Sequence, residues 1–237
     1  MNDIDILKLY FKDEELQKAI KEYENGVPAA YIIGEWEFFG DRYVLNQDCL
    51  IPRCDTERVV EKVLDKLRDD GRLLDLCTGS GCIAISTLKR KPNASGIAVD
   101  ISSKAIEAAK ENALINHVND RLKFICADIF DKPLGDERFD VIVSNPPYIP
   151  TQDLESLDKY VKKEPMIALD GGNDGMDFYN FLVSNYKDNL TENGLFIFEI
   201  GYDQQEKIQE TALFNGFECT VTKDYSGNPR VAVLKKI

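Results

Sequence analysis

From residue 72 onward, short apolar runs alternate with longer amphipathic stretches, and this alternation restricts the possible folds more than any other feature of the chain. The runs at 141–143 and 195–198 are wholly apolar, which is typical of strands buried on both faces of a parallel sheet. The pattern therefore predicts an α/β fold in which helices cover such a sheet. Strands are expected at 72–77, 95–100, 122–126, 140–144 and 195–200, helices at 82–89, 103–116 and 178–190, and an antiparallel C-terminal hairpin at 218–222 and 230–235 on the sheet's edge.

The N-terminal part of the chain follows other patterns. Residues 3–24 have the apolar spacing of one amphipathic helix, which the turn at 25–28 should end. The aromatic segment 31–46 predicts a β-hairpin, and a second amphipathic helix is expected over 56–67. We therefore divide the chain into a short N-terminal helical segment (1–30), a β-hairpin linker (31–55) and a large α/β domain (56–237).

Composition argues against several kinds of function. The chain has 29 basic and 42 acidic residues, a net charge of −13, whereas binding a nucleic-acid backbone depends on Lys and Arg. No run approaches the ~18 apolar residues that cross a membrane, and the N-terminal residues do not resemble a secretory signal. The six cysteines form no C-x-x-C pair, and His117 is the single histidine. We expect a cytoplasmic protein with no metal site, no membrane partner and no direct nucleic-acid partner.

A glycine-rich loop follows the first expected strand. In open α/β sheets ligands bind beyond the carboxyl ends of the strands, so this loop is a candidate ligand site. Glycines there let the backbone turn sharply and approach a ligand closely. The loop also fits the G-x-G-x-x-A dinucleotide fingerprint, although such turns serve many ligands or none. Its residues are Cys77, Thr78, Gly79, Ser80 and Gly81.

Three acidic residues narrow the choice of ligand. Asp100 closes the second expected strand, where a carboxylate can accept both hydroxyls of a ribose. Asp75 favours S-adenosylmethionine over a dinucleotide, because a carboxylate in the loop can organise it and attract the cationic methionyl end but repels a pyrophosphate. Asp128 is placed to accept from an adenine amino group. Ile129 and Phe130 could cover that ring or simply pack at the strand end.

The most specific motif is Asn145-Pro146-Pro147-Tyr148, directly after the fourth expected strand. The two prolines fix φ and carry no amide donors, so the loop presents its acceptors rigidly. The nitrogen of an amide or aromatic amine is a poor nucleophile because its lone pair is delocalised. The Asn145 side-chain oxygen and the Pro146 carbonyl could hold both N–H groups and aim the nitrogen at a sulfonium methyl group, while Tyr148 stacks on the planar group. A methyltransferase acting on a planar nitrogen is therefore predicted.

At these motifs the chain resembles the HemK-type release-factor glutamine methyltransferases, the protein-(glutamine-N5) methyltransferase family. The likeness extends from about Pro28 to the C-terminus. Asn-Pro-Pro-Tyr alone is shared with adenine-N6 and some guanine-N2 nucleic-acid methyltransferases, whereas the block at 53–57 looks particular to the protein-glutamine group. Further matching blocks are 31–34, 50–57, Glu164-Pro165, 199–201 and Asp224 with Gly227 and Arg230.

The resemblance implies a Rossmann-like seven-stranded methyltransferase fold that uses S-adenosylmethionine. It implies that the substrate is the glutamine of a Gly-Gly-Gln loop in a peptide-chain release factor. Cys77 to Gly81 and Asp100 would bind the cofactor, with Asp128 and Ile129 near its adenine. Asn145 to Tyr148 would bind the glutamine amide, with Asn145 also touching the cofactor. The family usually carries proline at the position of Cys54 and a larger N-terminal helical domain that docks the release factor, so 1–30 is interpreted as a reduced docking domain.

Three alternatives remain beside this interpretation. An amino-group methyltransferase on DNA or RNA would need a basic surface, which the composition does not indicate. A cofactor-binding module without catalysis would not need an intact Asn145–Tyr148 loop. A nicotinamide oxidoreductase would explain the glycine loop but would leave Asn145 without a role.

Overall fold

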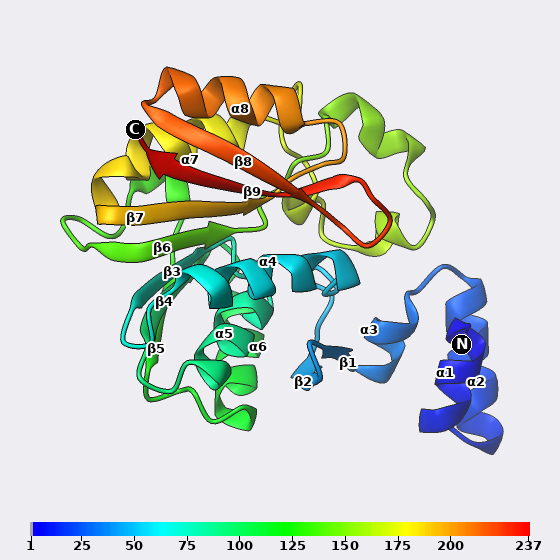
Figure 1. Cartoon of the computed structure of the whole chain (residues 1–237). Coiled ribbons are helices and arrows are strands. Elements are labelled where there is room, and N and C mark those ends of the chain that lie inside the picture. Colours follow the sequence, from blue (N-terminus) through cyan, green and yellow to red (C-terminus); the bar gives the residue numbers. More distant parts are fainter. Residues whose placement is uncertain (1) are drawn as a thin grey trace.

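The computed structural model describes residues 2–237, and its centre is a seven-stranded sheet in the order β5-β4-β3-β6-β7-β9-β8 (Figure 1). Strands β3 to β7 run parallel, while β8 and β9 form the predicted antiparallel C-terminal hairpin at one edge. The predicted α/β fold and seven strands are thus confirmed. The strands are β3 (Arg72–Leu76), β4 (Ser95–Asp100), β5 (Leu122–Cys126), β6 (Phe139–Ser144), β7 (Leu190–Glu199), β8 (Phe217–Lys223) and β9 (Pro229–Lys236).

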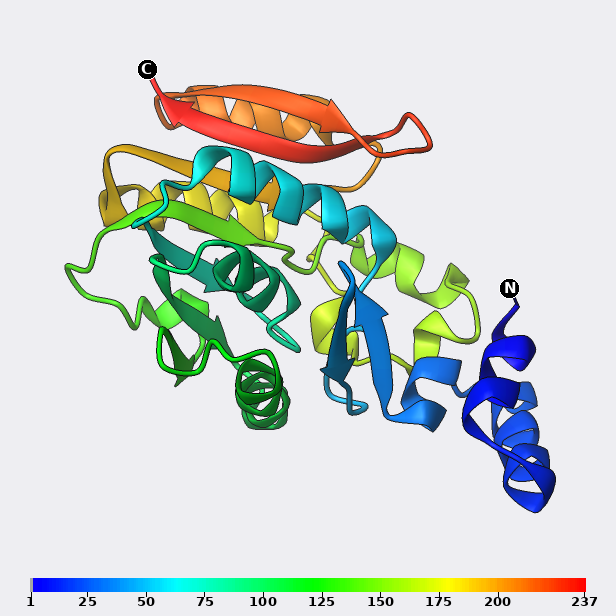
Figure 2. The ribbon, with the colours of Figure 1, turned by 60° about the horizontal axis from the view of Figure 1, so that its bottom comes forward.

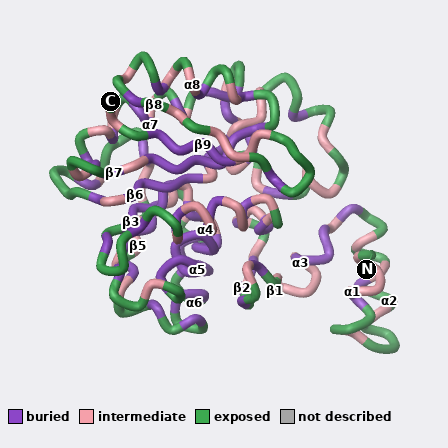
Figure 3. Tube along the Cα trace, in the orientation of Figure 1, coloured by how far each residue is buried: buried purple, intermediate pink, exposed green. Residues whose placement is uncertain are grey.

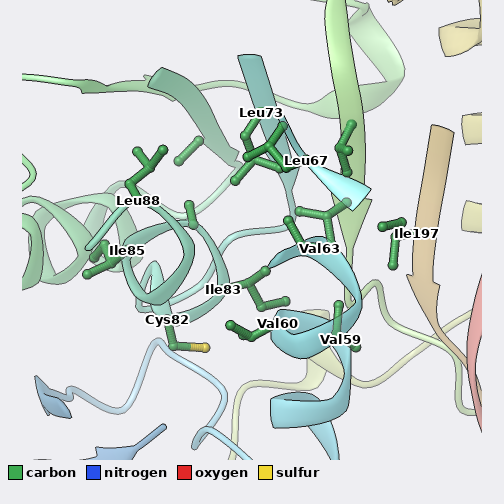
Figure 4. Packing of buried hydrophobic residues seen from close by; sticks show 14 of the residues in the cluster. Val59, Val60, Val63, Leu67, Leu73, Cys82, Ile83, Ile85, Leu88 and Ile197 are labelled. Atoms are coloured by element: carbon green, nitrogen blue, oxygen red, sulfur yellow. The ribbon is translucent and has the colours of Figure 1, made fainter. Parts of the chain in front are cut away.

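Helices cover both faces of this sheet, and Figure 3 shows the central strands as largely buried. On one face α4 (Cys54–Lys66) and α5 (Cys82–Arg90) pack their apolar sides on the strands, as the side chains in Figure 4 show, with α6 (Ser103–Ile115) beside them. On the other face lie α7 (Asp177–Tyr186) and α8 (Gln205–Phe214). Helix α8 was not expected from the sequence. It buries only Ile208 and Ala212, so its apolar stripe is too weak to indicate a helix.

The chain order reverses at the centre of the sheet, between β3 and β6. The two strands pair in parallel with Leu76 opposite Ser144, so the loops that follow them start side by side. Ligands in open α/β sheets bind at such a reversal point. The glycine-rich loop and the Asn145 loop therefore meet at the carboxyl edge of the sheet.

The prediction of one helix over 3–24 is wrong. Two helices form instead, α1 (Asp3–Tyr10) and α2 (Asp13–Glu24), because Phe11 and Lys12 adopt extended backbone conformations between them. This break lets Leu7 of α1 and Ala19 of α2 pack in one small cluster with Ala29. In Figures 1 and 2 the pair stands at the end of the molecule, away from the sheet. None of the described helices is long and apolar enough to cross a membrane.

The predicted hairpin starts later than expected. The first residues of the 31–46 segment belong to a short helix, α3 (Ala29–Ile33), which Gly34 ends with φ 79°. Ile32 and Ile33 face the α1–α2 cluster, and this packing favours helix over strand. The hairpin itself is β1 (Glu35–Phe38) and β2 (Asp41–Val44).

The hairpin is tied to the α/β domain through β2. The Tyr43 hydroxyl lies 2.6 Å from that of Ser86 on α5, and the Val44 N–H donates to Asn112 on α6 at 2.6 Å.

Between β6 and α7 the chain forms short 3₁₀ turns, and two more follow β5 and α7. These turns are Ile129–Asp131, Thr151–Ser156, Val161–Lys163, Met166–Ala168 and Lys187–Asn189.

Candidate active site

A cavity of about 300 Å³ opens at the carboxyl ends of the parallel strands, beside the reversal point. It is closed on one side by the segment before α4, which includes Ile51, Pro52 and Arg53. Most of the predicted site residues meet in its wall, although they come from four different strand ends. Those residues are Cys77, Thr78, Gly79, Ser80, Asp100, Asp128, Ile129, Asn145 and Pro147.

The two glycines of the loop serve different purposes. Both have positive φ, 55° at Gly79 and 81° at Gly81, which favours glycine at either position. A Cβ at Gly79 would meet no atom within 4 Å, so this side of the loop leaves room for a ligand to approach the backbone. A Cβ at Gly81 would lie 2.7 Å from the Ile85 side chain. Gly81 therefore allows close packing of the loop on α5 and does not line the cavity.

Asp75 lies behind the loop, outside the cavity wall. Its carboxylate is fully buried and accepts from the Thr78 hydroxyl at 2.6 Å and from the Ala84 N–H at 3.3 Å. Burial raises the pKa of this carboxyl to about 7, partly offset by these hydrogen bonds. Asp75 thus organises the loop, and it reaches a ligand in the cavity only through the loop.

Asp100 joins the end of β4 to the glycine loop. Its two oxygens accept from the Gly79 N–H at 2.8 Å and the Ser102 N–H at 2.9 Å, while burial raises its pKa. Each carboxylate oxygen has a second lone pair, so the group retains the capacity to accept from two hydroxyls.

The end of β5 provides a second acidic residue and an aromatic group. One oxygen of Asp128 accepts from the Phe130 N–H at 2.9 Å, which leaves its other oxygen for a donor in the cavity. Ile129 is buried in the cavity wall. Phe130 is 42% exposed and packs on Phe181 with ring centroids 4.5 Å apart, so it forms a flat apolar rim.

The Asn145 side chain belongs to a buried polar network that the sequence analysis did not assign. Its amide NH₂ donates to the Thr56 hydroxyl at 3.4 Å, and that hydroxyl donates to Glu199 at 2.6 Å. The Tyr148 hydroxyl donates to the other Glu199 oxygen at 3.4 Å. Among residues 2–237, the side-chain oxygen of Asn145 is buried and has no hydrogen-bond partner. An unpaired buried acceptor is costly, so this oxygen is a candidate to receive a donor from a bound molecule.

A second, more open groove of about 870 Å³ lies on the other side of the Asn145 loop. Ile51, Pro52 and Arg53 line both spaces, whereas Asn145 lines the cavity and Tyr148 lines the groove. The loop thus stands between the smaller cavity and the larger, more open groove. Pro146 lines neither space.

An ion pair holds the segment that separates the two spaces. Glu164 is buried, accepts from the Ile51 N–H at 3.0 Å and pairs with Arg53. Arg230, which lines the groove, pairs with Asp224 at 3.3 Å and lies 3.5 Å from Asp55. Arg53, Glu164, Asp224 and Arg230 all belong to the blocks that carry the family resemblance, although sequence reasoning gave them no role.

The residues of the cavity fit S-adenosylmethionine by their chemistry. Asp100 and Asp128 keep acceptor capacity for hydroxyl and amino groups, Phe130 and Ile129 offer apolar surface for a ring, and Gly79 leaves space beside the backbone. Solved structures of methyltransferases share this fold. A methyltransferase from Pyrococcus furiosus is 20% identical with a TM-score of 0.63, covering 93% of this chain and 98% of that one. A ribosomal protein L11 methylase from Lactobacillus delbrueckii is 22% identical with a TM-score of 0.58, covering 85% and 89%.

Fold and cavity together define an S-adenosylmethionine-dependent methyltransferase, and residues 55–165 match the family model of the methyltransferase small domain. The release factor glutamine methyltransferase of Aquifex aeolicus is 37% identical over 98% of this chain and 81% of its own length. That of Geobacter sulfurreducens is 42% identical over 86% of this chain and 72% of its own length. The chain belongs to the release factor glutamine methyltransferase family.

Proposed function

We propose that this enzyme transfers a methyl group from S-adenosylmethionine to the side-chain amide nitrogen of the glutamine in the Gly-Gly-Gln loop of a peptide-chain release factor. The observation that carries the proposal is the buried, unpaired oxygen of Asn145 between cavity and groove. A primary amide brings two N–H donors, and an acceptor left without a partner is what such a group needs. The proposal includes a cytoplasmic location, because release factors terminate translation in the cytoplasm.

The residues of the Asn145 loop would orient the amide rather than activate it chemically. The Asn145 oxygen accepts one N–H group and so fixes the direction of the nitrogen. The Pro146 carbonyl, predicted as the second acceptor, belongs to a residue that lines neither space, so the proposal does not depend on it. Tyr148, on the groove side, covers one face of the planar amide. Bound S-adenosylmethionine supplies an electrophilic methyl group on a positively charged sulfur. No general base is needed before transfer, because the nitrogen proton becomes acidic only once the nitrogen is alkylated and then leaves to solvent.

The cofactor would be held by residues from several strand ends. Asp100 would accept from the ribose hydroxyls, and Asp128 from the adenine amino group, with Ile129 and Phe130 along the ring. The backbone from Cys77 to Ser80 would follow the methionyl part, and Gly81 would support that stretch from α5. The groove, which Tyr148 and Arg230 both line, would take the peptide on either side of the glutamine.

Mass spectrometry of release factors after incubation with enzyme and S-adenosylmethionine tests the proposal. We expect one added methyl group on the glutamine of the Gly-Gly-Gln loop. With a net charge of −13, we expect no measurable transfer to duplex DNA or to ribosomal RNA stripped of protein. Labelled methyl in either nucleic acid, abolished by Asn145→Ala, would instead support the nucleic-acid alternative.

The α1–α2 pair is proposed to dock the release factor and to leave the chemistry to the α/β domain. It contacts the α3 cluster, and Tyr23 stacks on Tyr160 at 4.8 Å beside a hydrogen bond from Lys159 to the Glu24 carbonyl at 3.4 Å. Tyr23 and Tyr160 line neither the cavity nor the groove. Deleting residues 1–24 should raise KM for the release factor while kcat stays within a few-fold, because a lost interface acts mainly on dissociation. Steady-state kinetics and circular dichroism would check this. A collapse of kcat at unchanged KM would show that the helices belong to the catalytic core.

A further inference from the structure

Three side chains from distant parts of the sequence form one hydrogen-bonded row beside the reacting loop. Glu199 ends β7, Thr56 lies in the first turn of α4, and Asn145 follows β6. Glu199 and Thr56 are each only 2% exposed, so water does not compete for their hydrogen bonds. Thr56 is 2.6 Å from Glu199 and 3.4 Å from the Asn145 amide nitrogen.

The chemistry of these groups gives the row a direction. The Glu199 oxygen beside Thr56 is the acceptor, so the Thr56 hydroxyl uses its one proton toward Glu199. Toward Asn145 the same hydroxyl can then only accept. An asparagine amide has one donating and one accepting end, so the donating NH₂ turns to Thr56 and the oxygen is left for another partner. That oxygen is the unpaired atom described above.

Both oxygens of Glu199 lie against hydroxyl donors. Its second oxygen accepts from the Tyr148 hydroxyl at 3.4 Å, so both oxygens face donors. Burial raises the pKa of Glu199, whereas the hydrogen bond from Thr56 and the nearby Arg230 charge oppose that rise. A carboxylate placed here without a use would be destabilising, which points to a role in the site.

We propose that Thr56 and Glu199 are positioning residues that set the orientation of the Asn145 amide, so that its oxygen and not its NH₂ faces the substrate nitrogen. The inference rests on the proposed function, because it needs a substrate that donates N–H groups. If the Asn145 side-chain amide were flipped, its NH₂ would face the N–H groups of the substrate. No hydrogen bond could then form between them, and the target nitrogen would lose its orientation. The two residues act through Asn145 and need not touch the substrate.

Matched variants of Thr56 and Glu199 test the proposal with the full-length enzyme and an intact release factor. Thr56→Val keeps the shape and removes the hydroxyl, and Glu199→Met removes the acceptor. Each should lower kcat by ~10-fold or more, with the affinity for S-adenosylmethionine and the melting temperature little changed. The conservative variants Thr56→Ser and Glu199→Gln keep a hydroxyl and an acceptor oxygen, and each should retain most of the activity.

The double variant separates positioning from independent structural damage. Because both residues act through one amide, Thr56→Val combined with Glu199→Met should lose little more than either single variant. Fully additive losses, or a Thr56→Val enzyme with wild-type kcat, would overturn the proposal.

A measurement without substrate keeps this inference apart from the proposed function. In nuclear magnetic resonance spectra, the Asn145 side-chain NH₂, identified by its loss in Asn145→Ala, should show a nuclear Overhauser contact to the Thr56 methyl group. The contact should weaken in Glu199→Met, where the hydroxyl has lost its acceptor and can donate to the Asn145 oxygen. A contact unchanged in Glu199→Met would overturn the inference. Failure of the wild-type enzyme to methylate a release factor would overturn the proposed function and leave this readout intact.

Discussion

Replacing Asn145 by alanine should lower kcat on the order of 10²-fold or more, while the affinity for S-adenosylmethionine stays within a few-fold. The reason is geometric. The amide nitrogen of glutamine reacts only when it is aimed at the methyl group, and the Asn145 side-chain oxygen is a buried, unpaired acceptor in the cavity wall. The variant loses the side-chain contact that fixes this direction. Single-turnover rates with saturating release factor, together with calorimetric titration of the cofactor, would measure both effects.

A matched control for this variant is Asn215→Ala. Asn215 also uses its side-chain NH₂ in a hydrogen bond, to the Thr211 carbonyl at 2.9 Å, but it caps α8 far along the chain from the reacting loop. Its removal should leave kcat unchanged. An Asn145→Ala enzyme that retained most of its turnover would rule out orientation by this side chain, and with it the proposed mechanism.

The order of strands and helices could be predicted because buried parallel strands have continuous runs of apolar residues. Strands β4 and β5 begin and end where the sequence indicates. Strand β7 begins at Leu190, earlier than predicted. The early start was missed because Glu192 and Asn193 are exposed and polar and give no strand signal. The break between α1 and α2 could not be predicted, since it depends on packing against α3, a contact that no local pattern encodes.

The candidate site could be predicted only as far as local motifs reach. The glycine loop, Asp100 and Asn145 each directly follow a strand, so their meeting at the sheet's edge follows from the fold class. Thr56 and Glu199 stand in the family blocks but acquire a role only through a hydrogen bond between residues separated by 143 positions. The same holds for Arg53 and Glu164. Asp75 shows the converse, since a carboxylate next to a ligand loop in sequence can lie behind it in space.

Removing the Asp100 carboxylate should weaken S-adenosylmethionine binding by ~1.5–3 kcal/mol, about 10- to 150-fold in Kd. Two losses combine in Asp100→Ala. The ribose hydroxyls would lose a charged acceptor, and the N–H groups of Gly79 and Ser102 would lose the partner that holds the glycine loop against β4. Both losses fall on the cofactor rather than on the Asn145 loop, which is built by β6 and supported by Thr56. The rate at saturating cofactor should therefore change much less than the affinity does.

Asp131→Ala is the control for Asp100→Ala, because Asp131 is an exposed acid of the 3₁₀ turn next to the cavity and does not line it. Isothermal titration of both variants at one ionic strength separates contact from general charge, since each variant changes the net charge by the same amount. If Asp131→Ala weakened binding as much as Asp100→Ala, the acidic surface as a whole would attract the cationic cofactor and Asp100 would hold no ribose. If Asp100→Ala bound with unchanged affinity, Asp100 would have to be removed from the cofactor site. A loss confined to Asp100→Ala, at an unchanged melting temperature, is the result that the two hydrogen bonds at the end of β4 lead us to expect.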